Sequence, residues 1–214
     1  MGSEMCIRDS PNTLHAASFL KCLFFVLGYH DRYPAQIMNK IQRAAEFAKT
    51  AHESIDQRRK YTNEPYIVHP EMVAGIVASV TDDENMICAA WLHDVVEDTP
   101  VTLAEINAEF GDDVAHLVDG LTNVSKLEDG NRETRVAIDR EHTATTDSRT
   151  KTIKLADLIA NLDGIADENA GFARKYMTEK ELLLTVLGDG HSELVQRVGE
   201  IIRVERQKLP ESAG

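Results

Sequence analysis

Apolar residues recur at helical spacing along almost the whole chain from residue 38 onward. Between 38 and 55, and again between 153 and 162, they fall at positions i, i+3, i+4 and i+7, which is typical of an amphipathic or buried helix. No segment alternates apolar and polar residues as a half-buried strand would, and no internal repeat is visible. The sequence therefore predicts one all-α domain over residues 38–207, folded as a single helical bundle, with a C-terminal tail at 208–214.

Local signals divide this domain into separate helices. Pro70 suits the first turn of a helix, Thr102 and Glu105 form a capping box, and Gly111 is a helix stop. The segment 125–150 is mostly polar and its helical stripe is weak, so no helix is predicted there. Helices are expected over 38–55, from about 70, from 86 to about 96, over 102–110, 112–124 and 153–162, and near 172–187 and 191–207.

Residues 1–37 do not match the rest of the chain. The string Met5-Cys6-Ile7-Arg8-Asp9-Ser10 resembles translated sequencing adaptor. The apolar run at 16–28 is interrupted by Lys21 and is shorter than the roughly 20 residues that cross a bilayer. It also lacks the basic start and the cleavage site of a secretory signal. We interpret 1–37 as a non-native or disordered extension and expect the natural start at Met38.

The chain is strongly acidic, with 36 Asp+Glu against 23 Lys+Arg and a formal net charge of −13. Residues 1–37 are balanced in charge, so the whole excess lies after them. This argues against a nucleic-acid-binding surface, which needs clustered cations, and any anionic ligand must meet a local basic patch. Three cysteines (Cys6, Cys22 and Cys88) do not make a disulfide framework, so we expect a cytoplasmic protein.

An adjacent imidazole and carboxylate, His93-Asp94, lie inside an apolar segment. Burying both is costly unless a partner holds them, and a divalent metal ion binds neutral imidazole and carboxylate together. A His–Asp hydrogen bond at a helix surface is the alternative for the pair alone. Glu97 and Asp98 follow four residues later, which places a second acidic pair one turn further along the same faces. A solvated helix end is their alternative, but four such groups favour a cation or a proton-transfer site.

Two more residues are candidates for the same site. His69 stands at the expected start of a helix and could supply a third ligand, although a capping or core histidine is the commoner reading. Asp157 lies among apolar residues, with Asn161 on the same helical face. A buried Asp needs a partner, and a metal ion, a salt bridge to Lys154 or a hydrogen bond at the helix end would each serve.

The order His69, His93-Asp94, Asp157 on a helical scaffold resembles the HD metal-dependent phosphohydrolases. From about residue 38 to 188 the chain is similar to the (p)ppGpp hydrolase domain of RelA/SpoT enzymes. The segments that carry this resemblance are Arg59-Lys60, Glu64–Pro70, Leu92–Thr99, Phe110-Gly111, Val118–Thr122 and Lys154–Asp157 with Asn161. Glu141-His142 resembles the small stand-alone hydrolases of the metazoan SpoT homologue type.

The resemblance implies an HD-domain enzyme that hydrolyses the 3′-pyrophosphate of ppGpp or pppGpp to GDP or GTP and pyrophosphate. It implies one Mn²⁺ ion, with four ligands: His69, His93, Asp94 and Asp157. Glu97 and Asp98 would position and deprotonate the attacking water. Arg59 and Lys60 would lie beside the base and phosphates of the nucleotide, and Asn161 beside its ribose. The expected partner is a small nucleotide, with no nucleic acid and no membrane.

The chain departs from the family pattern at four positions. Leu158 replaces an Arg, Ala160 a bulkier residue, Asn63 a Gly and Gly164 a Thr. These departures leave open a phosphatase for NADPH or another phosphorylated nucleotide. A non-catalytic alarmone-binding regulatory domain is a third hypothesis, against which the intact Glu97-Asp98 pair argues.

The oligomeric state stays open, with a homo-oligomer among the alternatives. Five further cations could extend a basic patch, although surface charge is the commoner role of each: Arg58, Lys151, Lys154, Arg174 and Lys175.

Overall fold

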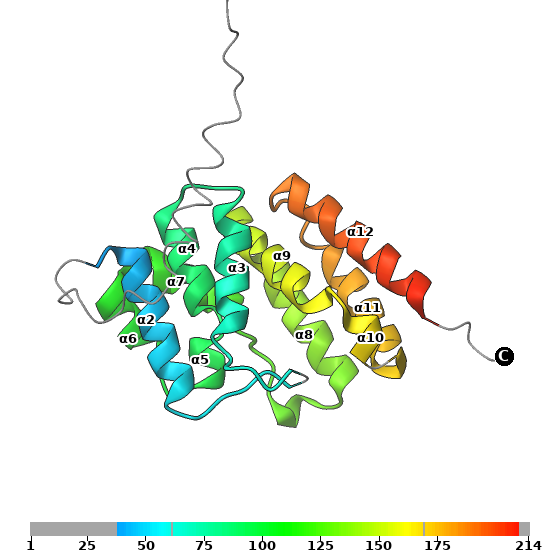
Figure 1. Cartoon of the computed structure of the whole chain (residues 1–214), viewed down its shortest axis with the longest axis horizontal. Coiled ribbons are helices and arrows are strands. Elements are labelled where there is room, and N and C mark those ends of the chain that lie inside the picture. The colour runs from blue at the N-terminus through cyan, green and yellow to red at the C-terminus, as the bar shows by residue number, and fades with distance from the viewer. Residues whose placement is uncertain (1–37, 61, 169, 210–214) are drawn as a thin grey trace, which may run out of the picture. The chain divides into compact units, whose positions relative to one another are not determined.

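The computed structural model describes residues 38–60, 62–168 and 170–209 (Figure 1). Over these residues the chain is helical and forms no strand, which confirms the all-α prediction. An isolated antiparallel bridge joins the backbones of Arg58 and Pro65. The predicted extension at 1–37 and most of the predicted tail, 210–214, lie outside the described residues. Among the helices described, none combines the length and the apolar character that a membrane crossing requires.

The helices follow one another in short steps along the chain. In order they are α2 (Lys40–Glu53), α3 (Val68–Ala78), α4 (Glu84–Leu92), α5 (Val95–Asp98), α6 (Leu103–Phe110), α7 (Asp112–Leu121), the 3-10 turn η2 (Leu127–Asp129), α8 (Arg132–Thr145), α9 (Ser148–Leu162), α10 (Ile165–Glu168), α11 (Ala170–Leu184) and α12 (Ser192–Lys208).

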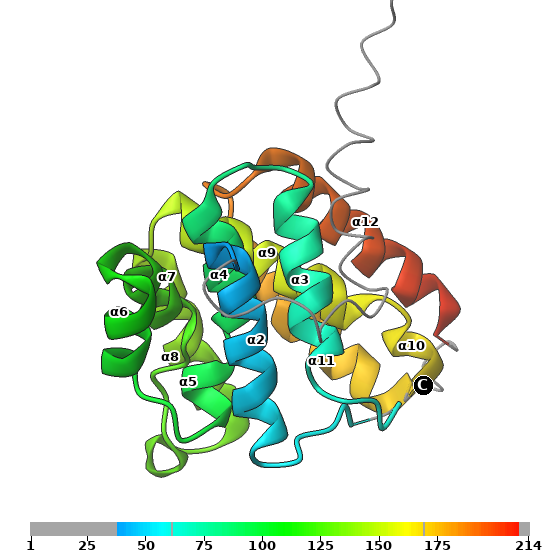
Figure 2. The same cartoon turned by 60° about the vertical axis from the view of Figure 1, so that its left-hand side comes forward.

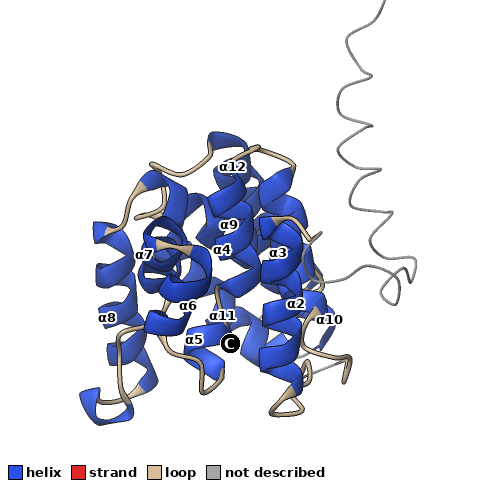
Figure 3. Ribbon diagram, turned by 90° about the vertical axis from the view of Figure 1, so that its left-hand side faces the viewer, coloured by secondary structure: helices blue, strands red, loops and turns tan. Residues whose placement is uncertain are grey.

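Helix α9 forms the centre of the bundle and packs against α3, α4, α7, α11 and α12 (Figures 2 and 3). Its apolar residues Ile153, Leu155, Leu158 and Leu162 are fully buried. A helix that is apolar on most of its faces is stable only inside a core. Any polar side chain on this helix is therefore held in the interior, and Asp157 is one of them.

The sequence signals for several helix ends are confirmed. Thr102 and Glu105 form the predicted capping box at the start of α6. Asn39 and Gln42 form a second one, which was not predicted, at the start of α2. Gly111 ends α6 with φ of 86°. In this left-handed region glycine has no Cβ to clash. Helix α7 ends at Leu121, a few residues before the predicted 124, because Thr122 adopts an extended backbone.

The prediction of one continuous helix from 86 to about 96 is wrong. Helix α4 ends at Leu92, and His93-Asp94 form the junction to α5. Asp94 has φ −98° and ψ −5°, which lies in the sparsely populated bridge region. The His93 ring contacts the Ala90 carbonyl oxygen at 2.8 Å, a side-chain alternative to a helical backbone bond. The pair is therefore set at a helix end rather than inside a helix.

The sequence also failed to predict α8, a helix of 14 residues. Thr143 is its one buried residue, so α8 has no apolar stripe for a pattern search to find. Asn131 caps its first turn through the Thr134 backbone N–H. Polar tertiary contacts then fix the helix, including an ion pair from Arg132 to Glu179 on α11.

Candidate metal centre

Three segments far apart in the sequence bring the predicted ligands together. His69 lies in the first turn of α3, His93 and Asp94 form the α4–α5 junction, and Asp157 lies on the central helix α9. Both imidazoles are buried, and Asp157 is 8% exposed. The side chains of these predicted ligands therefore come from two helices and a helix junction and face a largely desolvated point, which is where charged groups interact most strongly.

The four side chains converge within a few ångströms. The Nε2 atoms of His69 and His93 lie 3.3 Å apart, and Asp94 Oδ2 lies 3.1 Å from His93 Nε2 and 3.6 Å from His69 Nε2. Asp157 Oδ1 lies 3.2 Å from His69 Nε2 and 3.8 Å from His93 Nε2. Ligand atoms of His69, His93 and Asp94 all fall within 4.8 Å of one another. Two nitrogens and two carboxylate oxygens are thus placed to surround one cation.

The chemistry of this donor set fits a divalent metal ion. The Nδ1 atom of His93 faces the Ala90 carbonyl, so it carries the proton and leaves Nε2 as the acceptor. This outer hydrogen bond is typical of metal-ligating histidines. Mixed imidazole and carboxylate ligands suit Mn²⁺, Fe²⁺ and Zn²⁺ among the common ions.

The carboxylates make this point strongly attractive to positive charge. Burial opposes protonation of His93, but the adjacent Asp94 carboxylate outweighs it and raises the pKa of His93 to about 9. Burial also opposes ionisation of Asp94, and the His93 imidazole overcomes this and lowers the pKa of Asp94. The field that stabilises a proton on the imidazole would equally stabilise a metal cation.

Tyr66 is a partner of the metal centre that sequence reasoning missed. Its hydroxyl donates a 2.5 Å hydrogen bond to Asp94 Oδ2. Burial, with the neighbouring Asp94 charge, raises the pKa of Tyr66, so the phenol stays protonated and acts as the donor. Its ring packs against His52 and His69 at centroid distances of 4.8 and 5.7 Å. Tyr66 therefore orients the carboxylate of a predicted ligand, and no spacing rule in the sequence would have indicated it.

Asp157 has two further partners on its own helix. Lys154 Nζ lies 3.4 Å from Asp157 Oδ2, and Asn161 Nδ2 donates to Asp157 Oδ1 at 2.5 Å. Burial would raise the pKa of Asp157, but the Lys154 ammonium outweighs it and holds that pKa well below its usual range. The salt bridge to Lys154 that was foreseen as an alternative is therefore present, together with a hydrogen bond from Asn161 near the end of α9.

Glu97 and Asp98 lie on α5, directly after the junction. The Asp98 backbone N–H donates to the Asp94 carbonyl at 2.9 Å, so Asp98 is one turn beyond Asp94. Asn123 donates to Glu97 Oε1 at 2.9 Å, and Gln57 donates to Asp98 Oδ2 at 2.8 Å. Desolvation by the surrounding protein raises the pKa of both carboxyl groups. A raised pKa makes a carboxylate a stronger proton acceptor.

The predicted nucleotide contacts are spread over two elements. Arg59 and Lys60 lie on the α2–α3 loop, which closes through a 2.9 Å bond from the Arg59 N–H to the Glu64 carbonyl. Lys60 Nζ lies 5.6 Å from the ring centroid of Phe172 on α11. Asn161 contacts Asp157, so it borders the cluster of predicted ligands directly. Among the described residues, the Arg59 side chain makes no hydrogen bond or ion pair with the ligand cluster.

Several other positions that the sequence singled out lie away from the ligand cluster. Asn63 adopts φ of 58°, as expected for a residue that replaces glycine in a left-handed turn. Leu158 is fully buried in the core. Lys151 is also buried and pairs with Asp189 at 3.2 Å, while Arg58 is exposed and pairs with Asp56. Neither cation joins the ligand cluster, whereas Lys154 does.

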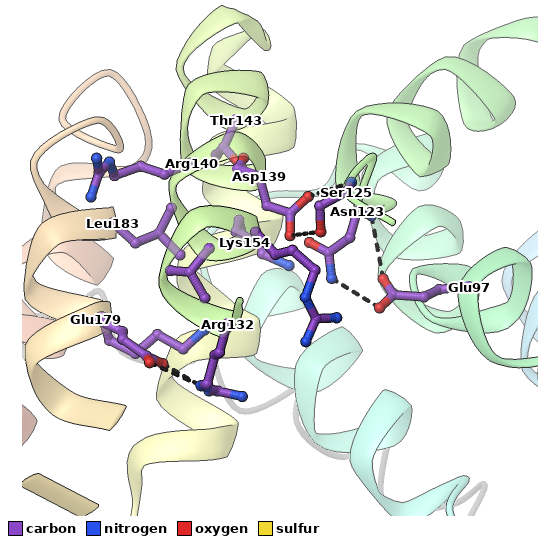
Figure 4. Close-up of a pocket in the computed structure, with 13 residues that line it drawn as sticks. Glu97, Asn123, Ser125, Arg132, Asp139, Arg140, Thr143, Lys154, Glu179 and Leu183 are labelled. Atoms are coloured by element: carbon purple, nitrogen blue, oxygen red, sulfur yellow. Dashed lines mark hydrogen bonds and ion pairs between the residues drawn. The ribbon is translucent and has the colours of Figure 1, made fainter. Parts of the chain in front are cut away.

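A polar cavity of about 290 Å³ adjoins the cluster (Figure 4). Five cations line it: Arg132, Arg135, Arg140, Lys154 and Lys180. Glu97 and Asn123 form one side, and Glu179 and Leu183 of α11 lie across from them in Figure 4.

Helix α8 contributes a whole face to this cavity, and sequence reasoning missed it. The lining residues of α8 are Arg132, Arg135, Val136, Asp139, Arg140 and Thr143. Their spacing of i, i+3, i+4, i+7, i+8 and i+11 is that of a helical stripe. A search for polar as well as apolar stripes could have found it.

Comparisons with known proteins identify the family. A family model described as HD domain matches residues 44–183. A Mycobacterium leprae protein named probable GTP pyrophosphokinase is 41% identical over 135 residues, which is 63% of this chain and 17% of that protein. An Aquifex aeolicus protein named guanosine-3′,5′-bis(diphosphate) 3′-pyrophosphohydrolase is 48% identical over 97 residues, 45% of this chain and 13% of that protein. The chain thus spans less than a fifth of the length of these two relatives.

Two solved structures share the fold over most of the domain. A metazoan ortholog of SpoT that hydrolyzes ppGpp matches with a TM-score of 0.71 and 29% identity, over 83% of this chain and 99% of that one. A Listeria monocytogenes protein matches with a TM-score of 0.56 and 26% identity, over 67% of this chain and 99% of that one. Because the family model covers more than half of the chain, this protein belongs to the HD domain family.

Proposed function

We propose that this chain is a metal-dependent hydrolase that removes the 3′-pyrophosphate of ppGpp or pppGpp, releasing pyrophosphate and GDP or GTP. The observation that carries the proposal is the convergence of His69, His93, Asp94 and Asp157 beside the acidic pair on α5. The names of the Aquifex relative and of the metazoan structure support this substrate. Mn²⁺ is the proposed ion, and the cytoplasm is the proposed compartment.

His69, His93, Asp94 and Asp157 would hold the ion. When bound, a divalent ion polarises the phosphoryl group under attack and lowers the pKa of water. Tyr66 keeps the Asp94 carboxylate in one orientation through its hydroxyl, and Lys154 does the same for Asp157. Well-held ligands keep their geometry through the reaction, which removes a reorganisation cost from the chemical step.

The acidic pair on α5 supplies the proton acceptor. Glu97 is held by Asn123 and Asp98 by Gln57, so each carboxylate keeps one oxygen directed by an amide. As a water oxygen bonds to the phosphorus next to the ribose, its proton passes to a carboxylate of this pair. The bond from that phosphorus to the ribose 3′ oxygen breaks, and the 3′ oxygen takes up a proton. The products are pyrophosphate and the nucleoside 5′-diphosphate or 5′-triphosphate, with no change of oxidation state.

Cations beside the centre would bind the anionic substrate in an otherwise acidic protein. Arg59 and Lys60 on the α2–α3 loop are the proposed contacts to the base and phosphates, and Asn161 the proposed contact to the ribose. Lys154 lies between the ligand cluster and the cavity, since it pairs with Asp157 and also lines the cavity. Short-range attraction of this kind works against the net charge of −13.

A substrate panel tests the proposal. Metal-replete protein is given ppGpp, pppGpp and NADPH in turn, and both pyrophosphate and orthophosphate are measured. We expect pyrophosphate from the two guanosine nucleotides in stoichiometric amount with GDP or GTP. Orthophosphate from NADPH with ppGpp untouched would replace this function with a nucleotide phosphatase. Binding of ppGpp with no turnover, under conditions where the metal is bound, would indicate a regulatory domain.

A further inference from the structure

The cavity beside Glu97 holds three cations that have no acidic partner in the part of the chain that the structure describes. Arg135 and Arg140 come from α8 and Lys180 comes from α11. The Nε atom of Arg135 is buried without a hydrogen-bond partner. Among the described residues, no carboxylate lies within 4.0 Å of the charged nitrogens of these three side chains. In a protein with excess acid, three unpaired cations around one cavity indicate a site for an anion.

The two other cations of the cavity are already paired. Arg132 makes a bidentate bond with Glu179 at 2.7 and 2.9 Å, and Lys154 pairs with Asp157. Asp139 accepts from the backbone N–H groups of Val124 and Ser125 at 3.0 and 2.9 Å. Asp139 and Glu97 thus accept hydrogen bonds from neutral donors. With five cations against three acids in its lining, the cavity keeps an excess of positive charge.

The cavity and the metal centre share a boundary. Glu97, the proposed water-activating residue, lines the cavity, and so does Lys154, whose Nζ is 3.4 Å from Asp157 Oδ2. A volume of about 290 Å³ is close to the lower end of small-molecule pockets, roughly 300 Å³. An anionic group that extends from a phosphorus at the metal centre would enter this space.

We propose that Arg135, Arg140 and Lys180 bind the distal phosphoryl group of a pyrophosphate ester, and that this contact selects pyrophosphorylated over monophosphorylated nucleotides. This inference rests on the proposed function, and the distal phosphoryl group is the feature by which the enzyme would recognise its substrate. In that reaction the pyrophosphate stays intact, because water attacks the phosphorus next to the ribose and the bond to the 3′ oxygen breaks. The distal group needs a binding site of its own throughout, and a monophosphate ester has no such group.

The electrostatics of Lys180 agree with an anion site. Burial lowers the pKa of Lys180, and the neighbouring Lys154 charge lowers it further. Its Nζ lies 4.8 Å from the Tyr176 ring centroid, which is a weak cation–π contact. Asp157 and Glu179 attract this ammonium group without pairing with it, and a phosphoryl oxygen would supply a direct counter-charge.

The test compares ppGpp with guanosine 5′-diphosphate 3′-monophosphate in the wild-type protein and in Arg140→Gln and Lys180→Gln. A hydrogen bond to a charged group is worth about 1.5–3 kcal/mol, so the ratio of the two kcat/KM values should fall roughly 10–100-fold in each variant. Arg140→Lys, which keeps the charge, should retain most of the selectivity. Arg203→Gln removes an exposed cation from α12 and should leave the ratio unchanged. An unchanged ratio in Arg140→Gln and Lys180→Gln would overturn the proposal.

A binding experiment separates this inference from the proposed function. Inorganic pyrophosphate and orthophosphate are titrated into the metal-free protein by calorimetry, where no turnover is needed. We expect tighter binding of pyrophosphate, and loss of that preference in the double variant Arg140→Gln/Lys180→Gln, whose fold is checked by circular dichroism. Equal affinity for the two anions in the wild-type protein refutes the inference. A wild-type protein that prefers pyrophosphate but hydrolyses no nucleotide refutes the proposed function alone.

Discussion

The Nε2 atoms of His69 and His93 lie 3.3 Å apart although the residues are 24 positions apart in the chain. Two neutral imidazoles that face each other through acceptor nitrogens repel unless a cation or a proton lies between them. Asp94 and Asp157 surround the same point with carboxylate oxygens. A cation bound at this point would account for burying two histidines and two acids in one small region.

Asp94→Ala should abolish metal binding and activity together. It removes a carboxylate oxygen that lies within 3.6 Å of both histidine nitrogens. Loss of a residue that only orients a ligand costs about 10–100-fold in metal affinity, and loss of the ligand itself should cost more. Metal content by mass spectrometry and turnover are measured beside Asp119→Ala, an exposed acid on α7. Full metal occupancy in Asp94→Ala would refute the ligand assignment.

Tyr66→Phe should weaken metal binding without preventing it. The change removes only the hydroxyl that donates to Asp94 Oδ2 and keeps the ring that packs on His52 and His69. We expect the Kd for the metal to rise about 10–100-fold, as for other residues that orient ligands. The Tm of the metal-free protein serves as the control for folding. An unchanged Kd would show that the hydroxyl does not orient the ligand.

Glu97→Gln and Asp98→Asn should keep the metal and lose turnover. Each change preserves shape and most hydrogen bonding but removes the proton-accepting charge. General base catalysis contributes about 10²–10⁴-fold, so we expect kcat to fall by that range in the variant that carries this role. Metal stoichiometry is measured in the same samples. If both variants kept the full kcat, the water-activating role would belong to another group.

Gly190→Ala should destabilise the protein, whereas Gly188→Ala should not. A Cβ at Gly190 would lie 2.7 Å from Leu155 Cδ1 and 3.2 Å from the Leu187 carbonyl oxygen, while a Cβ at Gly188 meets nothing within 4 Å. Crowding of a packed core costs about 1–3 kcal/mol, and an unhindered surface change stays within about 0.5 kcal/mol. Urea unfolding of both variants gives the comparison. Equal free energies of unfolding would contradict the close approach of this turn to α9.

Acid should remove one identifiable contribution to stability. The hydrogen bond from Arg149 lowers the pKa of Asp113 to about 2, and the two side chains are 2.6 Å apart. A lowered pKa in the folded state means that the contribution is complete above about pH 4 and is lost as the pH falls through 2. Both side chains are partly exposed, so its size is about 0.2–1 kcal/mol. The gap in unfolding free energy between the wild type and Asp113→Asn should therefore close between pH 4 and pH 2. A gap that stays constant over that range would refute this link, and Asp119→Asn serves as the matched control.

The two ends of α6 followed from local chemistry, whereas α9 begins at Ser148, five residues before the predicted start. The Thr102–Glu105 capping pair and the glycine at 111 each act within one turn of backbone, so the sequence predicts these helix ends without knowledge of the fold. The break between α4 and α5 did not follow, because it depends on a side-chain bond from His93 to Ala90 that competes with the helix. Helix α8 was missed for a related reason, since distant polar partners rather than an apolar stripe stabilise it.

The sequence by itself determined the helical class and the ligand candidates, because helical periodicity and the cost of burying His and Asp are properties of short segments. Only the tertiary structure decided that His69, His93, Asp94 and Asp157 meet at one point, since they come from three separate segments packed around α9. It alone also placed Tyr66 on Asp94 and the cations of α8 and α11 around one cavity. Such relationships depend on how helices pack, and helix packing is set by contacts between residues far apart in the chain.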